Sequence, residues 1–171
     1  LGEHPDINIP GIEVNSGSLG HGLGIGSGMA LAAKIDATNY RTFVLLGDGE
    51  CNEGSVWEAA MFAAHHNLEN LTAIVDRNGL IIHGTTEEIN QLDPLDKKFE
   101  SFGWHVESID GHNINEIVSK VKVNHSGKPK IIIANTVKGK GVSFMENVAN
   151  WHHGGISDEL YEQAKTELIS H

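Results

Sequence analysis

The sequence predicts an α/β domain built on a mainly parallel sheet flanked by helices. Two short apolar runs of β type, at residues 42–46 and 71–75, enclose a helical pattern at 53–67, and the three together make a βαβ unit. A third apolar run at 131–134 has no polar alternation, as expected of a strand buried on both faces. Strands that alternate with helices are typical of a parallel sheet with helices packed on it.

Length and composition indicate one globular domain, at residues 1–171. The chain is long enough for a hydrophobic core, and 39% of its residues are hydrophobic and 20% charged. The formal net charge of −11 disfavours nucleic acid or an anionic membrane surface as a partner. We find no signal peptide and no membrane-spanning segment in the sequence.

The cysteine and histidine content and the first residue of the sequence add to this interpretation. The single cysteine, Cys51, excludes an internal disulfide and fits a reducing compartment, so we expect a cytoplasmic protein with Cys51 as a small filler. The eleven histidines are scattered and, with one cysteine, form no zinc pattern. The chain starts with Leu1 instead of Met, which is typical of a start within a longer protein.

A glycine-rich loop at residues 16–22 follows a loop-rich entry and opens a helix expected to end near residue 36. Such a loop before a helix suits an anion, but it lacks the G-x-G-x-x-G spacing of a dinucleotide site. Small residues fall four apart on two helical faces: Gly20, Gly24 and Gly28 on one, and Gly22, Gly26 and Ala30 on the other. Each interior glycine costs ~1 kcal/mol against alanine, so we expect close packing against another backbone, within the domain or in a partner.

Polar side chains follow both strands of the βαβ unit. Asp48 comes directly after the first strand and Asn78 after the second, so parallel pairing brings both to the carboxyl edge, where open α/β sheets bind ligands. Carboxylate and amide oxygens are ligands that Mg²⁺ and Ca²⁺ prefer. The helix that starts near Glu53 favours an anion. A metal-bound diphosphate is the economical interpretation, and a turn merely closed by Asp48 is the alternative.

The remaining elements follow in order along the chain. Asn113 with Glu116 makes a capping-box-like helix start, and Ser157 is a plausible cap for the last helix. The basic glycine loop at 137–142 either contacts a phosphate or is a mobile, solvated loop. The expected elements are a polar loop at 85–96, a short helix at 94–102, a strand at 104–109, a helix at 114–123, a strand at 130–136 and an amphipathic helix at 156–170.

Several separated motifs resemble the transketolase family of thiamin-diphosphate enzymes. Gly47-Asp48-Gly49, followed after a helix by Asn78, resembles the thiamin-diphosphate fingerprint. The segments Glu-Gly-Ser-Val-Trp-Glu-Ala-Ala at 53–60 and Asp-Arg-Asn-Gly-Leu at 76–80 are similar to transketolase more than to other members of that superfamily. The resemblance covers nearly the whole chain and is closest to the short, separately encoded N-terminal transketolase subunits.

The resemblance implies a bound cofactor and its metal ion. Mg²⁺, with Ca²⁺ as a substitute, is expected on Asp48, Asn78 and the backbone oxygen of Leu80. Thiamin diphosphate is expected to contact residues of several loops: Gly17, Ser18, Leu19, Gly49, Glu50, Asp76, Asn78 and His152.

The resemblance also implies catalytic residues. His4, in a His-Pro-Asp segment, matches a histidine that reaches the sugar donor's hydroxyls, although a surface loop histidine is the alternative. His152 matches the histidine of a Trp-His-Gly pattern, which touches diphosphate and sugar, but the doubled histidine leaves the role open to His153. Glu53 and Glu58 match glutamates that the family buries in a proton-sharing network between paired active sites; on the sequence alone they are surface carboxylates.

The implied reaction moves a two-carbon ketol unit from a ketose to an aldose phosphate. Two parts of the family are missing from this sequence: an N-terminal portion before His4, and the pyrimidine-binding domain with the glutamate that activates the cofactor. The domain is therefore expected to be incomplete at its N-terminus. We expect no turnover by this chain alone, a C-terminal transketolase subunit with the pyrimidine domain as its partner, and a dimer of such pairs.

Three other interpretations stay open at this point. A related condensing enzyme such as deoxyxylulose-phosphate synthase shares the fingerprint. A non-catalytic cofactor-binding or scaffold subunit is the second, against which the retention of Asp48, Gly49 and Asn78 argues. A Mg²⁺-dependent phosphohydrolase is the third, and the sequence lacks the second acidic cluster that it needs. The role of His21, where larger transketolases have glutamine, is open as well.

Overall fold

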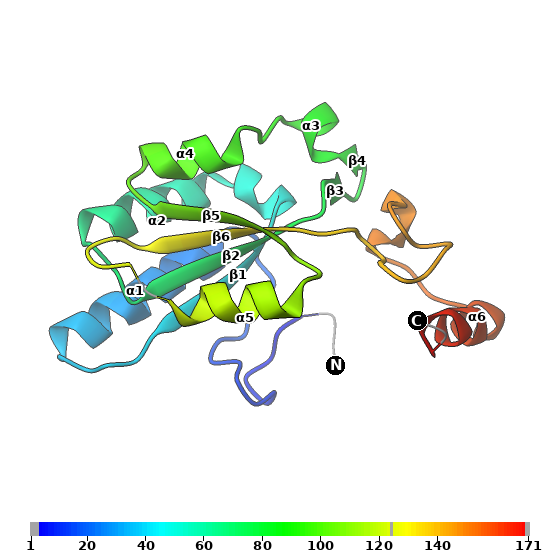
Figure 1. Ribbon diagram of the computed structural model, residues 1–171, viewed down its shortest axis with the longest axis horizontal. Coiled ribbons are helices and arrows are strands. Elements are labelled where there is room, and N and C mark those ends of the chain that lie inside the picture. The colour runs from blue at the N-terminus through cyan, green and yellow to red at the C-terminus, as the bar shows by residue number, and fades with distance from the viewer. Residues whose placement is uncertain (1–3, 124, 170–171) are drawn as a thin grey trace.

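The computed structural model describes residues 4–123 and 125–169 (Figure 1). Leu1, and Ser170 at the expected end of the last helix, lie outside these ranges. In chain order the elements are α1 (His21–Ile35), β1 (Thr42–Gly47), the 3₁₀ helix η1 (Gly49–Asn52), α2 (Gly54–His65), β2 (Leu71–Arg77), β3 (Leu80–Ile81), β4 (Gly84–Thr85), α3 (Thr86–Ile89), α4 (Leu95–Ser101), β5 (His105–Asp110), α5 (Ile114–Lys122), β6 (Lys130–Asn135), η2 (Ala149–His152) and α6 (Asp158–Ile169).

Four parallel strands form the sheet in the order β1-β2-β6-β5. Thr42 pairs with Leu71 at the start of β1 and β2, and His105 pairs with Lys130 at the start of β5 and β6. All four strands therefore begin at one edge of the sheet and end at the other. The short strands β3 and β4 make a separate antiparallel hairpin after β2. The predicted parallel sheet with its βαβ unit is confirmed.

Helices cover the two faces of the sheet unequally. On one face, α1, α2 and α4 bury the larger core, with Leu23, Val56 and Phe99 among its fully buried side chains. The small residues Ala59, Ala60 and Ala63 of α2 also lie in this core. On the other face, Ile117 and Val121 of α5 pack on a smaller cluster from β2, β5 and β6. The central strand β6 is buried throughout residues 130–134, as its unbroken apolar run indicated.

Strand β1 differs from the buried strand that its apolar sequence suggested. It is an edge strand, and its residues alternate between buried and exposed. Phe43 is 47% exposed and Leu45 72%. The reason is that α5 covers the smaller face only from β2 to β5, so the outward side chains of β1 have no helix over them in the described part of this chain.

Side-chain caps explain where the helices α3, α5 and α6 begin. Residues 85–96 were expected to be a polar loop, but the capping box of Thr85 and Glu88 starts the short helix α3 there. The side chain of Asn113 accepts a hydrogen bond from the Glu116 amide at 3.2 Å, so the predicted cap of α5 is confirmed. Ser157 accepts a hydrogen bond from the Leu160 amide at 3.3 Å at the start of α6.

Helix α6 lies apart from the sheet, beyond the segment that follows β6 (Figure 1). The Ser143 amide and hydroxyl donate hydrogen bonds of 2.6 and 2.8 Å to the Glu167 carboxylate, and Leu168 lies against Gly141. The helix is thus attached to the loop at 137–152. Within the described ranges, no helix combines the length and the apolar character that crossing a bilayer requires.

The two glycine faces of α1 differ in their packing: Gly26 faces strand β1, and Gly24 faces open space. Alanine at these two positions therefore gives a matched pair of variants. A Cβ on Gly26 would lie 2.3 Å from Val44 Cγ2, whereas a Cβ on Gly24 would meet nothing within 4 Å. We expect Gly26→Ala to lower the free energy of unfolding by about 1–3 kcal/mol, because the helix must move away from β1. Gly24→Ala is expected to raise it by up to about 1 kcal/mol through helix propensity. Urea denaturation measures both, and equal stabilities would contradict this packing.

Candidate active site at the carboxyl edge of the sheet

Asp48 is the centre of a hydrogen-bonded group at the carboxyl ends of β1 and β2. Its side chain is almost fully buried, and the residue is 2% exposed. Its Oδ1 accepts a hydrogen bond from the Gly49 amide at 2.7 Å, and its Oδ2 accepts from the Gly79 amide at 2.6 Å. Its own amide donates to the Asp76 carbonyl at 3.2 Å. The chain after β2 is therefore held against the end of β1.

Asn78 lies in the same turn, as the parallel pairing predicted. The Gly79 amide donates to Asp48 Oδ2, and Gly79 has a φ of +76°, a conformation that favours glycine. The Asn78 side-chain oxygen accepts a hydrogen bond from the Leu80 amide at 3.0 Å, and Leu80 begins β3. The structure thus brings Asp48, Asn78 and Leu80 together at one edge of the sheet.

The oxygen atoms of this turn suit a hard cation. A carboxylate offers about four acceptor positions, and the described hydrogen bonds to Asp48, including one from Arg77, use three of them. A carboxylate, an amide oxygen and a carbonyl are the ligand types of Mg²⁺ and Ca²⁺ sites. The chemistry of these residues therefore fits a divalent cation bound beside Asp48.

Arg77 is a component of this group that the sequence analysis missed. Its guanidinium pairs with Asp48 at 3.2 Å, and it also contacts Thr86 Oγ1 and Glu87 Oε1 at 2.7 Å each and Asp93 at 3.3 Å. Burial lowers the pKa of Arg77, but Glu87, Asp93 and Asp48 outweigh it and raise the pKa above its ordinary value. The side chain therefore stays charged and joins the turn that carries Asn78 and Gly79 to α3. Its position directly before Asn78 was the available signal.

Glu50, expected at the cofactor, binds backbone amides of two elements. Its carboxylate accepts hydrogen bonds from the Gly20 amide at 2.8 Å and from the Gly47 amide at 3.1 Å. The Ser55 hydroxyl donates to the Gly20 carbonyl at 3.0 Å. Gly20 has a φ of +81°, and a Cβ there would lie 2.4 Å from Ser55 Oγ. Glu50 thereby fixes the start of α1 beside the end of β1.

The glycine loop before α1 is open to solvent next to this group. Gly17, Ser18 and Leu19 are exposed, Leu19 to 60%. His4 is exposed as well, and its ring lies against Gly17, where a Cβ would be 2.9 Å from His4 Cδ2. The structure therefore brings His4 to the loop that the sequence assigned to the cofactor.

Gly49 lies between Asp48 and the hairpin that follows β2. A Cβ at Gly49 would lie 2.4 Å from Ile81 Cγ2, so the packing of Ile81 requires glycine. Helix α2 begins at Gly54, next to the predicted start at Glu53. Because η1 lies between Asp48 and α2, the amide that reaches the Asp48 carboxylate belongs to Gly49.

Asp76 and Cys51 both have partners within the fold. The Thr136 hydroxyl donates a hydrogen bond to Asp76 Oδ1, which ties the ends of β2 and β6 together. Cys51 is fully buried, and burial, with the charges of Glu50 and Asp48, raises the pKa of its thiol to about 12. The expectation of a small, unreactive filler at Cys51 is confirmed.

His152 reaches this edge from η2. Partial burial, with Lys138 and His153, lowers its pKa below the ordinary value, while Asp48 acts in the opposite direction. A lowered pKa favours the neutral ring, in which one nitrogen donates and the other accepts a hydrogen bond. Helix η2 lies against β3, so His152 is close to the turn that follows β2.

Glu53 and Glu58 are exposed in this chain, in contrast to the buried network that the resemblance implies. Glu53 is the residue before α2, and its Cβ lies against Gly20, where an added Cβ would be 2.6 Å away. Glu58 lies one turn further along α2. Both carboxylates thus face solvent next to the site.

Comparisons of the sequence with known proteins all lead to the same family. Residues 2–170 match the family model described as "Transketolase, thiamine diphosphate binding domain". The chain is 49% identical over 170 residues to one of the subunits of the apulose-4-phosphate transketolase of Phocaeicola vulgatus, covering 98% of this chain and 60% of that protein. It is 47% identical over 171 residues to the 6-deoxy-6-sulfo-D-fructose transketolase subunit SqwG of a Clostridium species, covering 98% of this chain and 62% of that protein. The chain thus spans about three fifths of these relatives.

Solved structures show the same fold. The transketolase of Campylobacter jejuni superposes with a TM-score of 0.86 at 32% identity, covering 97% of this chain and 27% of that chain. The transketolase of Pichia stipitis, in complex with sedoheptulose-7-phosphate, superposes with a TM-score of 0.84 at 32% identity, covering 94% of this chain and 26% of that chain.

Proposed function

Because the chain belongs to the transketolase family, of which it carries the thiamine diphosphate-binding domain, we propose that it acts in a split transketolase as the diphosphate-binding subunit or a part of it. The reaction is the transfer of a two-carbon ketol unit from a ketose to an aldose phosphate. Two relatives named as transketolase subunits, at 49% and 47% identity, support this over the other condensing enzymes and over a phosphohydrolase.

The observation that carries the proposal is the buried carboxylate of Asp48, held by two backbone amides beside Asn78. In the proposal, Asp48, Asn78 and the Leu80 carbonyl hold Mg²⁺, which neutralises the diphosphate. Thiamin diphosphate, when bound, supplies the stabilised carbanion that the transfer needs. Retention of the buried acid with its amide partners also argues against a degenerate scaffold subunit.

The chain's own residues then position the cofactor and the sugar. The exposed loop of Gly17, Ser18 and Leu19 borders the diphosphate, together with Gly49. The neutral ring of His152 donates one hydrogen bond and accepts another, so it can contact diphosphate and sugar together. His4 binds sugar hydroxyls. Glu50 and Asp76 support the site indirectly. Glu50 fixes the start of α1, and Asp76 fixes the end of β2.

The partner in this proposal is a C-terminal transketolase subunit with the pyrimidine-binding domain. It supplies the glutamate that activates the cofactor, and Glu53 and Glu58 form the proton-sharing network once two such pairs make a dimer. The chain's relatives are named as subunits, which supports a partner chain. The free, buried Cys51 supports a cytoplasmic enzyme.

Calorimetric titration of thiamin diphosphate tests the cofactor proposal. We expect binding by the complex of this chain with its partner subunit in Mg²⁺, and loss of binding when a chelator removes the cation. Ketol transfer from a ketose phosphate is measured on the same preparations. Binding that needs no divalent cation would contradict the metal site, and turnover by this chain without a partner would contradict its role as one half of a split enzyme.

A further inference from the structure

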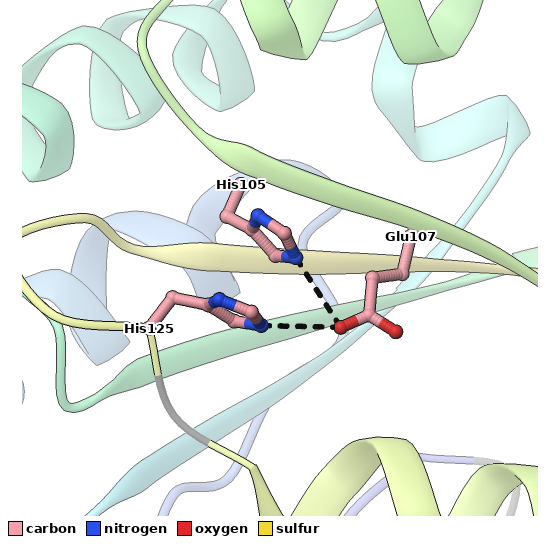
Figure 2. A group of neighbouring side chains, drawn as sticks. All are labelled: His105, Glu107 and His125. Carbon is pink, nitrogen blue, oxygen red and sulfur yellow. Dashed lines mark hydrogen bonds and ion pairs between the residues drawn. The ribbon is translucent and has the colours of Figure 1, made fainter.

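A cluster of three side chains lies at the opposite edge of the sheet from Asp48. His105 opens β5, and Glu107 follows two positions later, on the same face of the strand. His125 comes from the loop between α5 and β6 (Figure 2). No ligand spacing in the sequence marks this group, because it is folding that brings two of the scattered histidines to one carboxylate.

The three side chains have the separations of a metal-binding group. His105 Nε2 lies 3.3 Å from Glu107 Oε1, and His125 Nε2 lies 3.2 Å from the same oxygen. The ligand atoms all lie within 4.8 Å of one another. A tetrahedral zinc ion with bonds of about 2.05 Å has ligand–ligand separations of about 3.3 Å. Two of the three separations therefore match this geometry already, and the stacked imidazoles need only turn apart.

We propose that His105, Glu107 and His125 form a Zn²⁺-binding site, with water as the fourth ligand. Two imidazoles and one carboxylate are a ligand set for zinc and not for Mg²⁺ or Ca²⁺, which prefer oxygen ligands. The side chains are partly buried, with His105 34% exposed, His125 33% and Glu107 12%. They are thus ordered by packing and still reachable from solvent.

The surroundings orient the carboxylate and leave one side of His125 open to solvent. Lys120 Nζ, from the last turn of α5, pairs with Glu107 Oε2 at 2.8 Å, which leaves Oε1 directed at the two imidazoles. His125 also lines a surface cavity of about 470 Å³, between Lys34, Arg41 and Glu69. His125 is therefore in contact with solvent on this side.

The neighbouring charges set how tightly the ion binds. Lys120 is 43% exposed and opposes a divalent cation. Lys130 is buried and donates hydrogen bonds to the carbonyls of Lys120 and Val123, so it fixes the end of α5 on β6. Removing the Lys120 charge should therefore strengthen zinc binding without disturbing the loop that carries His125.

The site would act as a clamp. The zinc ion would join strand β5 to the loop between α5 and β6. Its ligands Glu107 and His125 are 18 residues apart in the sequence. Because the cluster lies at the amino edge of the strands and Asp48 at the carboxyl edge, the ion stabilises the fold without entering the candidate active site.

Zinc titration of the metal-stripped chain tests the proposal. We expect one Zn²⁺ per chain with a rise in thermal stability, tetrahedral d–d absorption when Co²⁺ replaces it, and shifted Nε2 resonances of His105 and His125 in histidine ¹H–¹⁵N spectra. Glu107→Gln and His125→Gln are each expected to weaken binding at least about tenfold. Lys120→Gln is expected to strengthen it about fivefold. His65→Gln, at the end of α2, is the matched control and should bind as the unmodified chain does.

Other outcomes overturn the proposal. It fails if the folded chain, checked by circular dichroism, binds no Zn²⁺. It also fails if Glu107→Gln and His125→Gln bind Zn²⁺ as the unmodified chain does, or if the shifted resonances belong to other histidines. If either variant unfolds, the test uses the Lys120→Gln titration and the resonances of the unmodified chain. The proposal then fails if Lys120→Gln does not bind Zn²⁺ more tightly, or if the His105 and His125 resonances do not shift.

Discussion

Replacing Asp48 with asparagine is expected to weaken Mg²⁺-dependent binding of thiamin diphosphate at least about 100-fold and to lower the free energy of unfolding by about 3–5 kcal/mol. The Asp48 carboxylate accepts hydrogen bonds from Gly49, Gly79 and Arg77. Asparagine offers one oxygen, and its amide NH₂ would face one of these donors. The variant also removes the negative charge that the cation needs.

The measurement combines calorimetry of the cofactor with urea denaturation of the chain. The matched control is Asp93→Asn, because Asp93 also pairs with Arg77, at 3.3 Å, but is 59% exposed. An exposed ion pair contributes about 0–1 kcal/mol, so the control should keep both the stability and the affinity. Unchanged Mg²⁺-dependent affinity in Asp48→Asn would show that the cation does not bind at this carboxylate.

Replacing Arg77 with methionine is expected to lower the free energy of unfolding by about 3–5 kcal/mol. The guanidinium is 11% exposed and is the cation that faces the buried Asp48. Methionine keeps a similar hydrophobic stem but leaves Asp48 without that partner, and it releases Thr86 and Glu87 of α3. Because the turn that carries Asn78 then loses its support, the affinity for Mg²⁺ and cofactor at the proposed site should fall about tenfold.

The loss of stability caused by Arg77→Met should become smaller at acidic pH. Arg77 has a pKa raised above its ordinary, strongly basic value, so its contribution is fully present below that value and does not vary across the neutral range. Burial raises the pKa of Glu87, but the hydrogen bond from Arg77 and those from two backbone amides outweigh it and lower the pKa below 4.5. The stability from Glu87 is therefore present above pH 4.5 and is lost as pH falls through its lowered pKa.

We thus expect the stability difference between Arg77→Met and the unmodified chain to narrow below pH 4.5. Urea denaturation at pH 7 and at an acidic pH well below that value measures it. Lys97→Met is the control, since Lys97 pairs with Glu100 on the nearby α4 but is 63% exposed; solvent screens this pair, so its loss should change the stability far less than the loss of Arg77 does. A loss for Arg77→Met no larger than for Lys97→Met would contradict the role given to Arg77.

Elements that depend on local pattern could be read from the sequence. The apolar runs predicted β1, β2 and β6, and the helical period between them predicted α2, because side-chain periodicity is a property of neighbouring residues. Parallel pairing of β1 with β2 then placed Asp48 and Asn78 at one edge. The cap at Asn113 was predictable for the same reason, since its partner is three residues away.

Contacts between distant segments could not be read in this way. The pairing of Arg77 with Asp48 and Glu87 depends on where α3 folds, and α3 was expected to be loop. The use of Glu50 to hold Gly20 depends on how α1 packs on β1. These bonds join a side chain to another side chain or to a backbone amide 10 to 30 residues away, and no periodicity marks them.

The sequence by itself therefore determined the parallel α/β architecture, the transketolase family motifs and the acid at the end of β1. Only the tertiary structure decided which groups surround that acid, that β1 is an edge strand, and that His105, Glu107 and His125 meet at the far edge. The physical reason is range: secondary structure follows from hydrogen bonds and side-chain periodicity within a few residues, whereas side-chain clusters follow from strand order and loop packing.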